Sequence, residues 1–182
     1  MDKNTAFEMY KMFRGEMYGH LNLHRETLQN YLAFSVAVLG ATIGGYLQLG
    51  QAAWIGTIIL FAGSILNIFV CVIAIRMCDR FYLGVLERVA IMAKIESILG
   101  LTNSRTKKSN QEKTMLLPKD KYLLPQRWVM GADLASTEEF IEKYQNAGVN
   151  HLAKTTFRVL IVLNVFLGVA GIAIAFLQYY SS

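Results

Sequence analysis

Two histidines and a glutamate near the N-terminus have a spacing that can bind a metal ion. His20 and His24 are four residues apart, and Glu16 lies one helical turn before His20. Side chains at i and i+4 share one face of a helix, and paired imidazoles can ligate zinc. The segment lacks the H-E-x-x-H pattern of zinc proteases. We therefore favour a pair of solvated histidines, and we predict no metal and no cofactor.

A basic segment in the second half of the chain offers contact with anions. It begins at Thr102, and its bases are Arg105, Lys107, Lys108, Lys113, Lys119 and Lys121. Such side chains can bind the phosphates of RNA or of lipid headgroups. Bases that flank apolar helices commonly serve topology and lipid contact, so we favour the lipid interpretation.

Long stretches without charge indicate membrane helices. The chain has 182 residues, of which 54% are hydrophobic, yet residues 27–75 and 159–182 contain no Asp, Glu, Lys or Arg. A transmembrane helix needs about 20 mostly apolar residues. The first stretch can hold two such helices, with a turn near Gly50, and the second stretch can hold one. The fold class is therefore an all-α membrane protein with about three transmembrane helices.

Helical periodicity also predicts helices outside the membrane. Residues 1–27 form an amphipathic N-terminal helix, weakened by Gly15 and Gly19, and residues 28–76 form the transmembrane hairpin. No proline separates the second membrane helix from the apolar stripe that follows, so one continuous helix projects into solvent and stops at Gly100. Residues 77–156 form a cytoplasmic helical region with the basic loop, and residues 157–182 form the third membrane helix and a short tail.

A capping pattern predicts where a later helix begins, and the distribution of Lys and Arg predicts the orientation of the chain in the membrane. Ser136-Thr137-Glu138-Glu139 is a capping-box pattern that starts a helix through about Asn146, after which Gly148 and Asn150 break or bend the chain. The 18 Lys and Arg residues all lie in residues 1–27 or 76–158. The positive-inside rule then puts both regions in the cytoplasm of an inner-membrane protein, with the N-terminus inside and the C-terminus outside.

Small and amide side chains interrupt the apolar spans. Gly40 and Gly44 on the first span, and Gly168 and Gly171 on the third, let helix backbones approach closely, either between subunits or within one. Asn67 and Asn164 are the most deeply placed amides. They either hydrogen-bond to each other, the simpler interpretation, or line a polar path through an oligomer.

The layout and one motif resemble known families. Arg14-x5-His20 is similar to the R-x(4-6)-H pattern of HEPN ribonucleases, in which an Arg and a His act on a phosphodiester. The layout of residues 18–100 resembles SLATT-like membrane effectors of anti-phage defence, and the small membrane accessories encoded beside CRISPR nucleases of the Cas13b type. The third span departs from the two-helix SLATT layout.

Three hypotheses about function follow. The resemblance implies a homo-oligomeric pore or channel-like effector that depolarises the membrane when infection is sensed, with a cytoplasmic defence protein as a partner. The second hypothesis is a membrane-tethered HEPN-type ribonuclease that uses Arg14 and His20. The third is a non-catalytic membrane anchor that recruits a cytoplasmic partner. We favour the pore, and hence no enzymatic activity.

Overall fold

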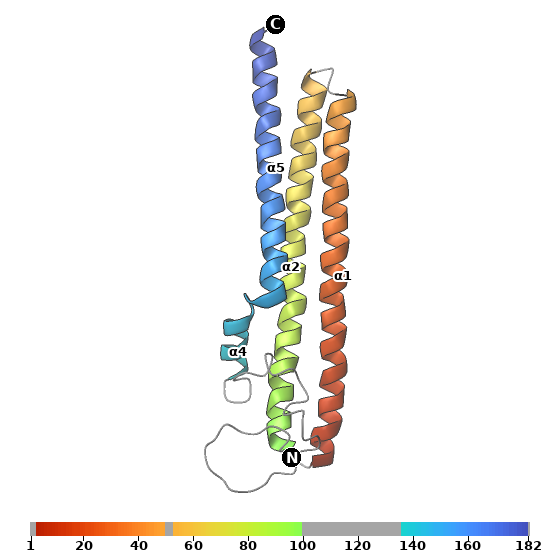
Figure 1. The fold of residues 1–182 in the computed structure, drawn as a ribbon, viewed down its shortest axis with the longest axis vertical. Helices are drawn as coiled ribbons and strands as arrows, with labels where there is room; N and C mark the ends of the chain where they lie inside the picture. The colour runs from red at the N-terminus through yellow and green to blue at the C-terminus, as the bar shows by residue number, and fades with distance from the viewer. Residues whose placement is uncertain (1–2, 50–52, 100–135, 182) are drawn as a thin grey trace. The chain divides into compact units, whose positions relative to one another are not determined.

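A computed structural model describes residues 3–49, 53–99 and 136–181. The predicted basic loop, with Arg105, Lys107, Lys108 and Lys113, lies outside these residues, as do the turn at Gly50 and the helix stop at Gly100. All the described elements are α-helices: α1 (Lys3–Leu49), α2 (Ala53–Leu99), α4 (Thr137–Tyr144) and α5 (Gly148–Ser181) (Figure 1). Three of them, α1, α2 and α5, are long and apolar enough to cross a membrane.

The helix boundaries correct the sequence analysis in three places. The amphipathic stretch and the first apolar span are not separate elements, because α1 is one 47-residue helix that continues through Gly15 and Gly19. An added Cβ at either glycine meets nothing within 4 Å, so both lie on an open face and cost only helix propensity. The last helix begins at Gly148 rather than at Phe157, and Asn150 lies inside it.

Other predicted boundaries are confirmed. Helix α2 runs without interruption over 47 residues, as the absence of proline predicted. Ser136 caps α4: its side chain accepts from the Glu139 backbone, and the Glu139 side chain accepts from the Ser136 backbone. Gly148 has a φ of +60°, a left-handed conformation that glycine adopts without strain, and this accounts for the break between α4 and α5.

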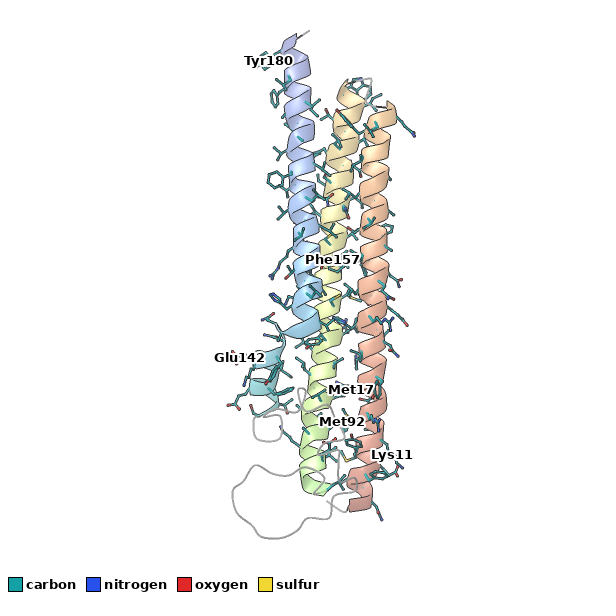
Figure 2. All side chains as sticks on the ribbon, in the orientation of Figure 1. Lys11, Met17, Met92, Glu142, Phe157 and Tyr180 are labelled. Carbon is teal, nitrogen blue, oxygen red and sulfur yellow. The ribbon has the colours of Figure 1, made fainter. Side chains whose placement is uncertain are left out.

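The chain divides into two compact units. Unit 1 comprises residues 1–23 and 80–148, and its core is made of apolar side chains from α1, α2 and α4. Met17 and Met92 lie between α1 and α2 in this core, whereas Glu142 lies on the outer side of α4 (Figure 2). The predicted stripe on α2 is correct for Val85, Val89 and Met92, which are all buried.

Unit 2 comprises residues 24–79 and 149–182, and it packs α1, α2 and α5 side by side. Cys71, Ala74, Cys78 and Phe157 form its apolar core, with partly buried residues such as Leu28 around them. Large apolar side chains lie on its outside, including Phe34, Phe69 and Phe166, of which 54%, 67% and 69% are exposed.

Close contact between α1 and α2 in unit 2 depends on Gly63. A Cβ added at Gly63 would overlap the hydroxyl and the methyl group of Thr42. The Thr42 side chain is β-branched, and its hydroxyl donates to the Val38 carbonyl at 2.7 Å, so it has little freedom to move aside. Glycine at position 63 therefore sets the distance between these two helices.

We expect Gly63→Ala to destabilise the chain by about 1–3 kcal/mol, the typical cost of overpacking. Thermal unfolding in detergent measures this. Gly168→Ala is the matched control, because its added Cβ would lie 3.6 Å from the Ser64 Cβ, an ordinary contact. The control should be neutral or slightly stabilising, and equal losses in both variants would contradict the argument.

Candidate functional site

Ser35, Asn67 and Asn164 form a hydrogen-bonded layer inside unit 2, with one residue from each long helix. All three are buried. Ser35 Oγ donates to Asn67 Oδ1 at 2.6 Å. Asn67 Nδ2 donates to the Ser35 carbonyl at 3.1 Å and to Asn164 Oδ1 at 3.3 Å. The structure thus brings together the two asparagines singled out in the sequence, and it adds Ser35, which the sequence analysis missed.

The hydrogen-bonding capacity of this layer is used within the chain. An asparagine amide has two hydrogens, and both hydrogens of Asn67 have partners. Asn164 Nδ2 donates to the Leu160 carbonyl at 2.7 Å. Ser35 Oγ also lies 3.4 Å from Cys71 Sγ, close enough for the thiol to donate to it. Asn67 therefore stabilises the packing of its own chain, since both of its donor hydrogens are used there.

A second polar cluster joins α2 and α5 at the charged edge of unit 2. Asp79 Oδ1 accepts from Asn150 Nδ2 at 2.8 Å and from Lys154 Nζ at 2.9 Å. Asn150 is 1% exposed, and 12% of the Lys154 side chain is exposed. The Asp79 side chain is 36% exposed, so the ion pair is only partly buried and water screens it in part. An ion pair and a hydrogen bond therefore join the two helices at this level.

His24 on α1 belongs to the same cluster, which corrects the expectation of a solvated histidine. Only 2% of His24 is exposed. Burial lowers the pKa of His24, while its hydrogen bond with Asn150 and the nearby Asp79 carboxylate act in the opposite direction. The sequence contains no local signal of this burial, because two charged residues, Arg25 and Glu26, directly follow His24.

The described residues include no arrangement of side chains that supports the metal hypothesis or the ribonuclease hypothesis. Among the described residues, no group of three or more His, Cys, Asp and Glu side chains could hold a metal ion. Arg14 is exposed and lies over the Tyr18 ring at 5.9 Å, whereas half-buried His20 packs against Gly84. Six residues along a helix separate two side chains by about 9 Å and about 120°. Within one chain, Arg14 and His20 therefore do not converge on a common substrate.

The two predicted small-residue surfaces have different environments. A Cβ added at Gly40 or Gly44 meets nothing within 4 Å, so this surface is open in the single chain. A Cβ added at Gly168 would lie 3.6 Å from Ser64, and one at Gly171 would lie 3.1 Å from the Leu60 Cβ. We therefore assign Gly168 and Gly171 to packing between α5 and α2 of the same chain, and not to contact between chains.

We expect Asn67→Leu to destabilise unit 2 by about 1–3 kcal/mol, because the Ser35 hydroxyl and the Asn164 carbonyl oxygen lose their partner. Asn164→Leu should cost less, since it removes one bond to Asn67. The double variant should reveal a coupling energy of about 0.6 kcal/mol or more, measured by denaturant titration of the four proteins. Asn30→Leu, at an exposed position of α1, is the control. Strict additivity of the two losses would contradict a direct bond.

Comparison with known proteins identifies no relative of this chain. No protein-family model matches it, and neither does any curated protein or solved structure.

Proposed function

We propose that this protein is a homo-oligomeric, channel-like effector of the bacterial inner membrane, which permeabilises or depolarises that membrane. The observation that carries the proposal is the open face of α1 around Gly40 and Gly44. A Cβ added at either glycine meets nothing within 4 Å, so these small residues are not used for packing inside the chain. This face is therefore available for contact with a second copy.

The outside of unit 2 supports insertion into a bilayer. Its exposed side chains are large and apolar, and only 11% to 33% of the most apolar window in each long helix is buried. At about 1.5 Å per residue, the 43-residue apolar span of α2 would be about 65 Å long, twice the hydrocarbon thickness. The bilayer therefore holds only the parts with almost no charge, about Leu28–Leu49, Trp54–Ile75 and Phe157–Tyr179, of which the last has Arg158 at its cytoplasmic end. Unit 1 then lies in the cytoplasm with most of the bases.

The shape of the α1 face suits a second helix. At about 100° per residue, Ala33, Ala37, Gly40 and Gly44 lie within about 40° of the direction opposite to Ser35. Ser35 points into unit 2, so these small residues point away from it. Large exposed side chains flank them, including Phe34, Val36, Ile43 and Leu47. A row of small residues between bulky ones forms a groove in which a neighbouring helix backbone can pack closely.

The ion path in this proposal lies between subunits. The Ser35, Asn67 and Asn164 layer is committed to packing, so it gives no continuous polar path through one subunit. Subunits that associate through α1 would enclose a path bordered by exposed faces of the long helices. This differs from a path lined by Asn67 and Asn164, which the sequence analysis left open.

The biological setting of the proposal comes from the resemblance to membrane effectors of anti-phage defence. Unit 1 is the part able to receive a signal from a cytoplasmic defence protein, because it combines a packed core with exposed charges. The ribonuclease alternative is less favoured, since Arg14 and His20 do not converge within the chain. A membrane anchor that recruits a partner remains the outcome to expect if the protein is monomeric.

The proposed orientation predicts the location of two reporters. A reporter fused after Ser182 should be active only outside the cytoplasm, and one inserted near Ser109 only inside, because the bases lie on the Ser109 side of every span. Alkaline phosphatase and green fluorescent protein fusions measure this. A C-terminus inside the cytoplasm would mean that the number of membrane spans is even.

Gly44→Leu should shift the protein toward smaller species in mild detergent and reduce ion leakage from liposomes. The added side chain should cost about 1–3 kcal/mol at each subunit contact, and the cost recurs around an oligomer. Light scattering gives the mass, and a potential-sensitive dye gives the leakage. Ala170→Leu, on an exposed part of α5, is the control and should change neither.

Two outcomes would count against the channel. A monomeric wild-type protein in mild detergent would exclude an oligomeric pore. An oligomer that leaks no ions at high density in liposomes, with its activating partner present, would instead favour the anchor.

A further inference from the structure

Glu96 is a carboxylic acid sealed inside the apolar core of unit 1. Its exposure is 0%. The cluster on this part of α2 contains Met92, Ala93 and Ile95, and α1 contributes Ala6 and Tyr10 to the same cluster. Asp and Glu are almost never fully buried unless they are paired. A glutamate at this position therefore needs a physical explanation.

The hydrogen bonds of Glu96 are incomplete. Tyr10 Oη donates to Glu96 Oε1 at 2.9 Å. Glu96 Oε2 has no hydrogen-bond partner among the described residues. An ionised carboxylate has room for about four hydrogen bonds, whereas a protonated one needs fewer and carries no charge. The site as built fits the neutral acid better than the anion.

Among the residues that the structure describes, the charged groups around Glu96 do not outweigh its burial. From α1, Tyr10 donates its bond and Arg14 contributes a positive charge, and both favour the anion. From α4, the side chains packed on the cluster are Phe140, Ile141 and Tyr144, none of them cationic.

The cations nearest in sequence on α2 have other partners. Lys94 donates to the Thr137 hydroxyl at 2.9 Å. Arg88 pairs with Glu16 and Glu87 at 3.1 Å and 2.7 Å. Burial is the larger effect on Glu96 and raises the pKa of its carboxyl, against Tyr10 and Arg14.

We propose that Glu96 is a proton-operated latch of unit 1: the protonated acid allows α1, α2 and α4 to pack together, and ionisation loosens that packing. The direction follows from linkage. An acid whose pKa is higher in the folded state than in the unfolded state contributes its full stability below the unfolded pKa. That stability is lost as the pH rises through the folded value. Unit 1 is therefore tightest in acid and looser toward alkaline pH.

The latch goes beyond the proposed channel and does not depend on it. It concerns the packing of unit 1 alone, so it holds equally for a channel, an anchor or any other membrane protein. Its consequence is that the pH of the compartment that contains unit 1 sets how readily α1 and α4 separate from α2. A partner that binds the separated form would then bind more tightly as the pH rises.

Hydrogen exchange of the full-length protein in nanodiscs tests the latch. Protection factors are measured from pH 5 to pH 8.5 and corrected for intrinsic exchange. In the wild type, amides at positions 85–96 should lose protection as the pH rises, by about tenfold for each unit that separates the two pKa values. In Glu96→Gln, which mimics the neutral acid, protection should not vary with pH and should match or exceed that of the acidic wild type.

Two further variants distinguish a latch from a merely structural residue. Tyr10→Phe removes the hydroxyl that donates to Glu96 Oε1, so it should move the loss of protection to higher pH. A purely structural effect would lower protection equally at every pH. Glu142→Gln, an exposed acid on α4, is the matched control and should retain the wild-type profile.

The proposal is overturned if Glu96→Gln keeps the pH dependence of the wild type. If that variant does not fold, the wild type still decides the question. A carbon-13 NMR titration of its labelled glutamate carboxyls should show one group that titrates well above the usual range. Ordinary titration of every glutamate would overturn the latch, and neither result depends on whether the protein forms a channel.

Discussion

Hydrogen bonding among Ser35, Asn67 and Asn164 is the interaction on which the packing of unit 2 depends. Helices with apolar surfaces all round have no strong preference for one another over lipid, because lipid tails are equally apolar. A buried amide does have a preference, since leaving it unpaired in an apolar medium costs several kcal/mol. The layer therefore fixes which faces of α1, α2 and α5 meet, and the glycines at positions 63 and 171 let them meet closely.

Unit 1 has an apolar interior in place of a hydrogen-bonded layer. Its interior is apolar and its outside carries charges, including those of Glu8, Lys11 and Glu142, as expected for packing driven by water. Helices α1 and α2 each contribute to both units. Unit 2 adds a hydrogen-bonded layer to its apolar core, and the apolar side chains on its outside are compatible with a membrane protein.

Two features of the described residues carry the two proposals. The face around Gly40 and Gly44 is open, while comparable small residues on α5 are packed. One oxygen of Glu96 is buried without a hydrogen bond, while the amide of Asn67 is fully satisfied. The open row of small residues is available for packing against another helix. The buried acid with incomplete hydrogen bonds favours its neutral form and can change its protonation state with pH. Both concern what the chain does after it has folded.

The sequence alone determined the elements of this protein. Charge-free stretches of sufficient length, an α2 without proline, and the capping box at Ser136 each reflect a local property that needs no partner to be recognised. The division of α1 after residue 27 failed because the end of the charged part of a sequence does not end a helix, and α1 continues through that point.

Tertiary structure alone decided which polar residues are buried and with what. Asn67 was recognisable because an amide stands out in an apolar run, but its partner Ser35 was not, since a serine in such a run has no distinguishing context. His24 lies between Leu23 and Arg25, and Glu96 lies between Ile95 and Ser97. These mixed neighbours do not mark either side chain as buried, and the burial arises only when other helices cover them. Periodicity predicts which face of a helix is apolar. It does not predict which helix will cover that face, because that choice depends on contacts between residues far apart in the chain.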